Sequence, residues 1–270
     1  MTYYNEHDQK AAAWLRELIA AGLIPAGDVD TRSIHDVRPH EIARYTQQHF
    51  FAGIGGWPLA LRLAGWPDSR PVRTGSCPCQ PFSQAGQGKG EADERHLWPV
   101  FRDLITFGDP TITFGEQVAS KAGRRWLANV RADLEGLGYA VGAADLCAAG
   151  VGAPHIRQRL FWVANATCQR RRGRQPMEDG IRKESGRPSA NLCADAWPDG
   201  FGRGSTLGVS DVLSPSHGLP GRVGLLRGYG NAIVPQVAAI FIDAAAEILT
   251  ANTKFSRRAD NAHPAAERTQ

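Results

Sequence analysis

Apolar and polar positions alternate along the chain in blocks that predict helices and short strands in turn. Apolar residues recur at helical spacing over 8–22, and a glycine ends that block. Residues 49–53 are typical of a buried strand that runs into a glycine-rich turn, and 57–65 of a helix with proline near its start. Similar blocks follow: strands at Val72–Gly75, 111–114 and 159–164, and helices over 96–105, 124–138 and 233–249. This alternation predicts an α/β fold with a largely parallel sheet.

The periodic pattern fades between about 164 and 222, where Gly, Arg, Pro and Ser dominate. Residues 166–187 hold seven basic and three acidic side chains, an excess equal to the formal net charge of +4 of the whole chain. Such a cluster suits contacts with nucleic-acid phosphates, and it equally suits a solvated loop. The charge pattern alone leaves both interpretations open.

Membrane and secretory functions find no support in the sequence. A membrane span needs about 18 consecutive apolar residues, and no run of that length occurs among the 270 residues. The first residues contain acidic side chains and lack the apolar core of a secretory signal. We therefore expect a cytoplasmic protein.

The five cysteines do not have the spacing of a metal site. No Cys-x-x-Cys pair is present, and an odd number of cysteines argues against a disulfide framework. Cys77 and Cys79 are one residue apart, and a redox pair there is disfavoured by that spacing and by the flanking prolines. We expect free thiols, at least one of them reactive, and no bound metal.

Five segments in order carry a resemblance to a known family. They are FFAGIGG, PCQPFSQAG, GEQV, PHIRQRLFWVA and RGYGNAIVPQVA, and they lie within 49–163 and 223–249. In this order they resemble the DNA cytosine-5 methyltransferases, and PCQPFS is the most specific of them. The resemblance implies a Rossmann-like fold that uses S-adenosylmethionine, with a small irregular target-recognition region and a shortened cofactor half.

The resemblance implies roles for four catalytic side chains. Cys79 would attack carbon 6 of cytosine, since a thiolate is both nucleophilic and a good leaving group. Glu116 would assist at nitrogen 3 of the ring, while Arg157 and Arg159 would hold the base and a nearby phosphate. The chain departs from the family pattern at Gln117, which follows Glu116 and stands in place of Asn, and at His155, which precedes Arg157 by two residues and stands in place of Gln.

The resemblance also implies the ligands and the residues that bind them. The target cytosine would be flipped out of double-stranded DNA, and the glycine- and glutamine-rich segment 81–99 would close over it. S-adenosylmethionine would be bound by Phe51, Ala52, Gly53, Ile54, Gly56, Pro78 and Asn231. DNA would be contacted by Gln80, Ser83, Arg170, Arg171 and Arg172. We expect a monomer, and the family context allows a restriction endonuclease as partner.

The interval between the glycine-rich turn and Cys79 is short. Only residues 57–78 lie there, whereas the family places two further strands in this interval, and one strand–helix–strand unit takes about 30 residues. The strand at 49–53 would then be a sheet edge. Residues 29–42 could supply that edge, with Asp36 as a candidate acid for the methyl donor, or residues 1–45 could be an unrelated extension. His49 also stands where the family commonly has Asp.

These considerations divide the chain into five parts and leave two functions open. We predict an N-terminal extension with a helix and a candidate edge strand (1–45), a catalytic core (46–163), a basic target-recognition region (164–222), a helix that returns to the core (223–250) and a polar tail (251–270). The first function is a DNA cytosine-5 methyltransferase. The alternative is a DNA-binding remnant of the family that has lost the methyl donor.

Overall fold

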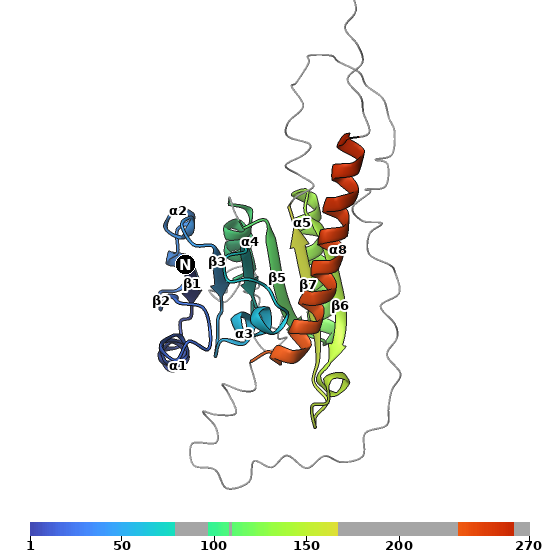
Figure 1. The fold of residues 1–270 in the computed structure, drawn as a ribbon. Coiled ribbons are helices and arrows are strands. Elements are labelled where there is room, and N and C mark those ends of the chain that lie inside the picture. Colours follow the sequence, from blue (N-terminus) through green and yellow to red (C-terminus); the bar gives the residue numbers. More distant parts are fainter. Residues whose placement is uncertain (79–96, 108–109, 167–231, 262–270) are drawn as a thin grey trace, which may run out of the picture.

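The protein has a single seven-stranded sheet with helices on both faces (Figure 1). The computed structural model describes residues 1–78, 97–107, 110–166 and 232–261, with 251–261 as backbone only. The strands are β1 (Thr2–Asn5), β2 (Gly27–Asp30), β3 (Gln47–Phe50), β4 (Val72–Gly75), β5 (Ile112–Val118), β6 (Ala140–Cys147) and β7 (Gln158–Asn165). Their order across the sheet is β2-β1-β3-β4-β5-β7-β6, and β7 is antiparallel to both of its neighbours. The predicted Rossmann-like α/β fold is confirmed.

The helices occur where the apolar periodicity predicted them. They are α1 (Gln9–Ala20), α3 (Gly56–Leu63), α4 (Trp98–Thr106), α5 (Lys121–Gly136) and α8 (Pro235–Asn261), with the short α2 (Pro39–Ile42), η1 (Ile34–Asp36) and η2 (Ala148–Val151) between strands. Asp8 caps α1 by accepting hydrogen bonds from two amides of its first turn, and Ser120 caps α5 through the amide of Gly123. Side-chain caps therefore fix where these two helices begin.

Residues 1–45 are part of the sheet. β1 pairs in parallel with β3 on one side and with β2 on the other. β3, the strand that precedes the glycine-rich turn, is therefore not at the edge of the sheet. Two strands, β1 and β2, precede β3 in the chain, and the interval 57–78 contains only the rest of α3 and β4. β3 therefore has a neighbour on each side although that interval is short.

This chain order requires one connection of unusual hand. Tyr4, His49, Thr74 and Phe114 lie in one row across the sheet, so they face the same side. Helix α1 packs on Tyr4 and α3 packs on Phe114, so both connections cross this face. The two connections run in opposite directions along the sheet: the first leads from β1 to the edge strand β2, and the second leads from β3 to β4, toward the centre of the sheet. Two such crossovers have opposite hands, and α3 departs from the right-handed rule that about 98% of connections obey.

Two apolar cores lie on the two faces of the sheet. Helices α3 and α8 cover one face, where Trp57, Phe114, Phe161 and Phe241 pack together. Helices α4 and α5 cover the other, with a core built around Phe101 and Trp162. The strand β6 at one edge was not predicted. Its sequence, AVGAADLC, mixes small residues with one acid and does not alternate strictly, so it is not recognisable as a strand. β6 is an edge strand that pairs only with β7.

Candidate active site

The predicted functional segments meet at the edge of the sheet where the parallel strands end. The glycine-rich turn follows β3, residues 76–78 follow β4, and Glu116 lies near the end of β5. Strand β7 is antiparallel and begins at this same edge, which places Arg159 opposite Val118. In open α/β sheets, ligands bind outside the carboxyl ends of the strands, so this edge is the expected site.

The turn after β3 has a backbone that depends on its glycines. Gly53 and Gly55 have φ angles of 56° and 82°, in the left-handed region that glycine occupies without strain. Phe51 also has a positive φ of 50°, which is uncommon for a side chain of this size. A Cβ atom on Gly56 would lie 2.7 Å from Ile233 Cγ1, so the turn can approach the start of α8 closely. The turn is thus a tight backbone cradle.

Glu6 lies beside this turn, directly after β1. Its Oε2 accepts a hydrogen bond of 2.7 Å from the amide of Gly53, and its Oε1 accepts one from the amide of Asp8. Glu6 was not among the residues that the sequence pattern predicted. Its local signal is an acid two positions after the tyrosines of YYNEHD, a segment that is not recognisable as a strand from its letters.

The suggested acid Asp36 lies elsewhere. It is exposed in η1, and β2, the strand before it, is separated from β3 by β1. The neighbour of β3 is therefore Thr2–Asn5 and not the segment 29–42. Asp30, at the end of β2, accepts hydrogen bonds from Tyr3 and Arg32.

The segment after β4 is held by hydrogen bonds from two side chains, Gln117 and Trp57. Cys77 is buried, as expected for a packed small residue, and its carbonyl accepts a 3.1 Å hydrogen bond from Gln117 Nε2. Trp57 Nε1 donates to Ser76 Oγ at 3.1 Å. Pro78 is exposed. The predicted residues Cys79, Gln80, Ser83, Arg170, Arg171, Arg172 and Asn231 lie outside the described residues.

Glu116 and Arg159 form a buried ion pair at this edge. Arg159 Nε lies 2.8 Å from Glu116 Oε1, and the two side chains are 17% and 8% exposed. Burial raises the pKa of Glu116, while Arg159, Ser76 and Arg157 oppose that rise. The carboxyl group is thus held in one orientation, and its neutral form is favoured relative to an ordinary glutamate.

Arg157 is bonded to the backbone that leads into α8. Its Nη2 donates a 2.6 Å hydrogen bond to the carbonyl of Ala232, just before α8. Burial, and then the charge of Arg159, lower the pKa of this guanidinium. The structure therefore brings Arg159 to Glu116 and ties Arg157 to the segment that leads into α8.

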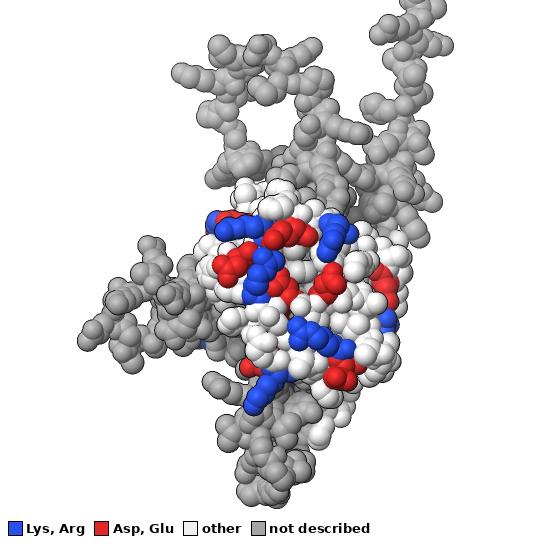
Figure 2. Space-filling view, turned by 90° about the vertical axis from the view of Figure 1, so that its left-hand side faces the viewer, with Lys and Arg blue, Asp and Glu red and all other residues white. Residues whose placement is uncertain are grey.

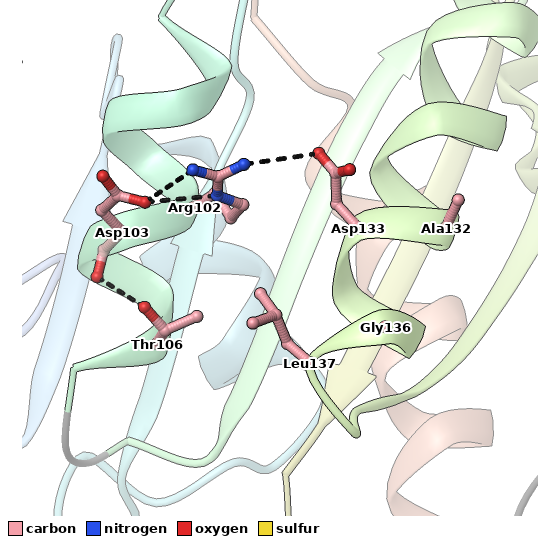
Figure 3. A pocket seen from close by; sticks show the side chains of 7 residues that line it. All are labelled: Arg102, Asp103, Thr106, Ala132, Asp133, Gly136 and Leu137. Atoms are coloured by element: carbon pink, nitrogen blue, oxygen red, sulfur yellow. Dashed lines mark hydrogen bonds and ion pairs between the residues drawn. The ribbon is translucent and has the colours of Figure 1, made fainter.

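A mostly apolar hollow lies beside the candidate site, and another lies away from it. One, of about 530 Å³, lies beside the glycine-rich turn and is mostly apolar, with Ile54, Trp14 and Ile233 among its lining residues. The other, of about 440 Å³, lies between α4 and α5 and contains Arg102 between Asp103 and Asp133 (Figure 3). The second is at the end of these helices away from Glu116, so it is not part of the candidate site.

His49 lies in the interior of the sheet behind the site. It is fully buried, its Nδ1 is 2.7 Å from Thr74 Oγ1, and its ring stacks on Tyr4 with a centroid distance of 5.2 Å. Burial lowers its pKa to about 3. The residue is thus a neutral part of the core and not an acid at the turn.

No group of three or more His, Cys, Asp or Glu side chains within the described ranges could hold a metal ion. None of the helices in the same ranges combines the length and apolar character needed to cross a bilayer.

Comparisons with known proteins agree with the sequence resemblance. Residues 68–187 match the family model of C-5 cytosine-specific DNA methylases. The Type II methyltransferase M.AplI of Arthrospira platensis is 39% identical over 108 residues, which are 39% of this chain and 30% of that protein. M.NlaX of Neisseria lactamica is 33% identical over 132 residues, 46% of this chain and 42% of that protein. The chain thus spans less than half the length of these relatives.

Among solved structures, a DNMT2 variant of Spodoptera frugiperda matches with a TM-score of 0.42 at 16% identity, covering 60% of this chain and 41% of that one. A methyltransferase of Entamoeba histolytica matches with a TM-score of 0.41 at 16% identity, covering 68% and 49%.

Proposed function

We propose that this chain, a relative of the C-5 cytosine-specific DNA methylases, transfers a methyl group from S-adenosylmethionine to carbon 5 of a flipped cytosine in double-stranded DNA. The observation that carries the proposal is the buried pair of Glu116 and Arg159. It lies at the ligand-binding edge of the sheet, beside the segment that leads to Cys79.

Glu116 suits the activation of a cytosine ring. Addition of a thiolate at carbon 6 pushes electrons toward nitrogen 3, so a hydrogen-bond donor at that nitrogen stabilises the developing charge. The raised pKa of Glu116 increases the fraction of the carboxyl group that can donate. Arg159 holds Oε1, so the carboxyl group has a fixed orientation at this edge of the sheet. We assign Glu116 to nitrogen 3 and Arg159 to the positioning of Glu116 and the base.

Cys79 is the nucleophile in this proposal. The Gln117–Cys77 hydrogen bond fixes the chain two residues before Cys79, in direct connection with the strand that carries Glu116. The thiolate would form a bond to carbon 6, and carbon 5 would then take the methyl group. Loss of the carbon-5 proton to water and elimination of the thiolate would restore the ring and release the product. Cys77 is too buried to compete with it.

The edge of the sheet also fits the methyl donor. The turn 51–56 contains three glycines at which its backbone can be approached closely, and Glu6 offers a carboxylate beside it that can accept hydrogen bonds from ribose hydroxyls. Phe51, Ala52, Gly53, Ile54, Gly56, Pro78 and Asn231 are the further residues that we assign to donor binding. The donor, when bound, supplies an electrophilic methyl group.

The DNA would be held by residues on several segments. We assign Gln80 and Ser83 to contacts near the flipped base and Arg170, Arg171 and Arg172 to phosphates. We expect the chain to act as a monomer, and a restriction endonuclease partner remains compatible with the proposal. No step requires a metal ion.

Methylation in cells expressing the protein tests the proposal. Bisulfite sequencing should reveal 5-methylcytosine with wild type and none above background with Cys79→Ala. Cys77→Ala is the matched control, because it removes the same sulfur atom two residues away and should retain methylation. Equal methylation with wild type and Cys79→Ala would refute the role of Cys79.

The alternative is a DNA-binding remnant without the donor. Calorimetry distinguishes the two, because a remnant would bind duplex DNA but show no heat with S-adenosylmethionine. The presence of both additional strands and of Glu6 at the turn favours a donor-binding enzyme.

A further inference from the structure

Ser76 lies next to Glu116 on the same face of the sheet. Gly75, at the end of β4, pairs with Gly115 on β5, and the residues that follow them are Ser76 and Glu116. The next residue on each segment is joined to the other by a hydrogen bond, so the two segments stay side by side beyond the ladder. Side chains alternate between the two faces of a sheet, so both residues face the same side as Phe114, on which α3 packs.

Trp57, the second residue of α3, determines where the hydrogen of the Ser76 hydroxyl points. The indole is buried and packs against Phe114 and Phe161, with ring centroids 6.3 and 6.1 Å away. Its Nε1 lies 3.1 Å from Ser76 Oγ and can only donate. The hydroxyl oxygen therefore accepts from Trp57, and its own single hydrogen is directed to another acceptor.

The carboxyl group of Glu116 is that acceptor. Burial raises the pKa of Glu116, and the interactions that oppose this rise are, in order, the charge of Arg159, the hydrogen bond from Ser76 and the charge of Arg157. Arg159 Nε lies 2.8 Å from Oε1 and comes from β7, on the other side of β5. The carboxyl group is thus held between a neutral donor on the β4 side and a cation on the β7 side.

We propose that Ser76, oriented by Trp57, is a positioning residue of Glu116: its hydroxyl donates to the carboxyl group and limits how tightly Glu116 retains the proton that it offers to nitrogen 3 of cytosine. The inference rests on the proposed function, because that function assigns Glu116 to nitrogen 3. A general acid works best when its pKa is close to the working pH. Burial favours the neutral acid, whereas the Ser76 hydrogen bond favours the carboxylate that remains as the proton moves to nitrogen 3.

The surroundings of Glu116 differ from those of the charged side chains on the surface. At the β2 end of the sheet, basic and acidic side chains are interspersed (Figure 2), and Arg32 and Glu41 form an ion pair in which they remain 47% and 37% exposed. Water screens such a pair, so one hydrogen bond changes little there. Glu116 is buried, and the lower local dielectric strengthens each hydrogen bond to its carboxyl group. A single hydroxyl can therefore affect the proton of Glu116.

Carbon-13 NMR of the full chain labelled at the glutamate carboxyl carbons tests the proposal without DNA or methyl donor. The Glu116 resonance is identified by its loss in Glu116→Gln. In Ser76→Ala, its titration midpoint should rise by about one pH unit, a tenfold change in proton affinity, because the carboxylate loses a donor. Ser76→Thr keeps the hydroxyl and should retain the wild-type midpoint. Ser33→Ala, the matched control, removes a hydroxyl that accepts from the amide of His35 beyond β2 and should leave the midpoint unchanged.

Two further measurements separate this role from a merely structural one. Trp57→Phe keeps a ring but removes the indole N–H, so the midpoint should rise by less than in Ser76→Ala, since the hydroxyl remains but can rotate. The single-turnover methylation rate falls above the pKa of the acid, so in Ser76→Ala this alkaline decline should begin about one pH unit higher than in wild type.

An unchanged Glu116 midpoint in Ser76→Ala would overturn the proposal, as would an equal rise in Ser76→Thr. A raised midpoint with an unmoved alkaline decline would overturn the catalytic part of the role. The two Ser76 variants decide the question if Trp57→Phe does not fold. A raised midpoint in a protein that methylates no duplex would support the hydrogen bond and refute the proposed function, so the two failures are distinguishable.

Discussion

Acidification should destabilise the protein through His49. The imidazole is fully buried and its pKa is about 3, compared with an ordinary value of 6.5. The unfolded chain therefore binds a proton at a pH where the folded protein does not. The stability that the neutral ring provides is complete above pH 6.5 and is lost progressively as the pH falls toward 3.

The loss of stability at a given pH follows from the difference between that pH and the ordinary pKa of an imidazole. At pH 5 the unfolded state is about 1.5 pH units below the pKa of a free imidazole, and each unit corresponds to about 1.4 kcal/mol. His49 should thus lower the free energy of unfolding by about 2 kcal/mol between pH 7.5 and pH 5. In His49→Asn, the amide oxygen can accept from Thr74 and cannot be protonated in this range.

Urea unfolding at several pH values measures this difference. His49→Asn should be less stable than wild type at neutral pH, because the smaller side chain loses the stacking on Tyr4. The gap should then narrow by about 2 kcal/mol at pH 5. His40→Asn controls for the loss of an exposed imidazole. Parallel profiles for wild type and His49→Asn would refute the idea that His49 is buried in its neutral form.

Two further substitutions test the packing of the sheet and the turn. Gly115→Ala should destabilise the protein by about 1–3 kcal/mol or more, because the new Cβ would lie 2.1 Å from Trp162 Cε2. Gly136→Ala is the control: nothing lies near the new Cβ, so this substitution should not lower the melting temperature. Glu6→Ala removes the carboxylate that accepts from the Gly53 amide, and calorimetry should show at least about tenfold weaker S-adenosylmethionine binding with unchanged affinity for duplex DNA. Unchanged donor affinity would remove Glu6 from the site.

The sequence predicts the elements that have length and regular periodicity. Helices α4, α5 and α8 and strands β5 and β7 were recognisable because each repeats its apolar pattern over several positions. The strands of residues 1–45 were not, because TYYN and GDVD are four residues long and the second contains one glycine and two acids. What makes them strands is parallel pairing with a partner distant in the chain, and no local pattern encodes that.

The residues of the candidate site also divide into those that a local motif predicts and those that depend on contacts between distant segments. The resemblance implied that Glu116 and Arg159 both act on the base, but their ion pair depends on the antiparallel pairing of β5 and β7, which was not predicted. The position of Glu6 depends on the unexpected strand β1, and Arg157 bonds to a carbonyl that is 75 residues away. Contacts of that kind are properties of the three-dimensional arrangement and not of any segment alone.

The position of β1 between β2 and β3 has a consequence for the nascent chain. Ribosomes synthesise residues 1–30 before 47–50, so β1 and β2 can pair while the other edge of β1 still lacks its partner. An unpaired strand edge is a template for unwanted association until it is covered. Translation slowed between 31 and 50 should therefore favour aggregation, and early completion of β3 would both protect that edge and bring Gly53 to Glu6.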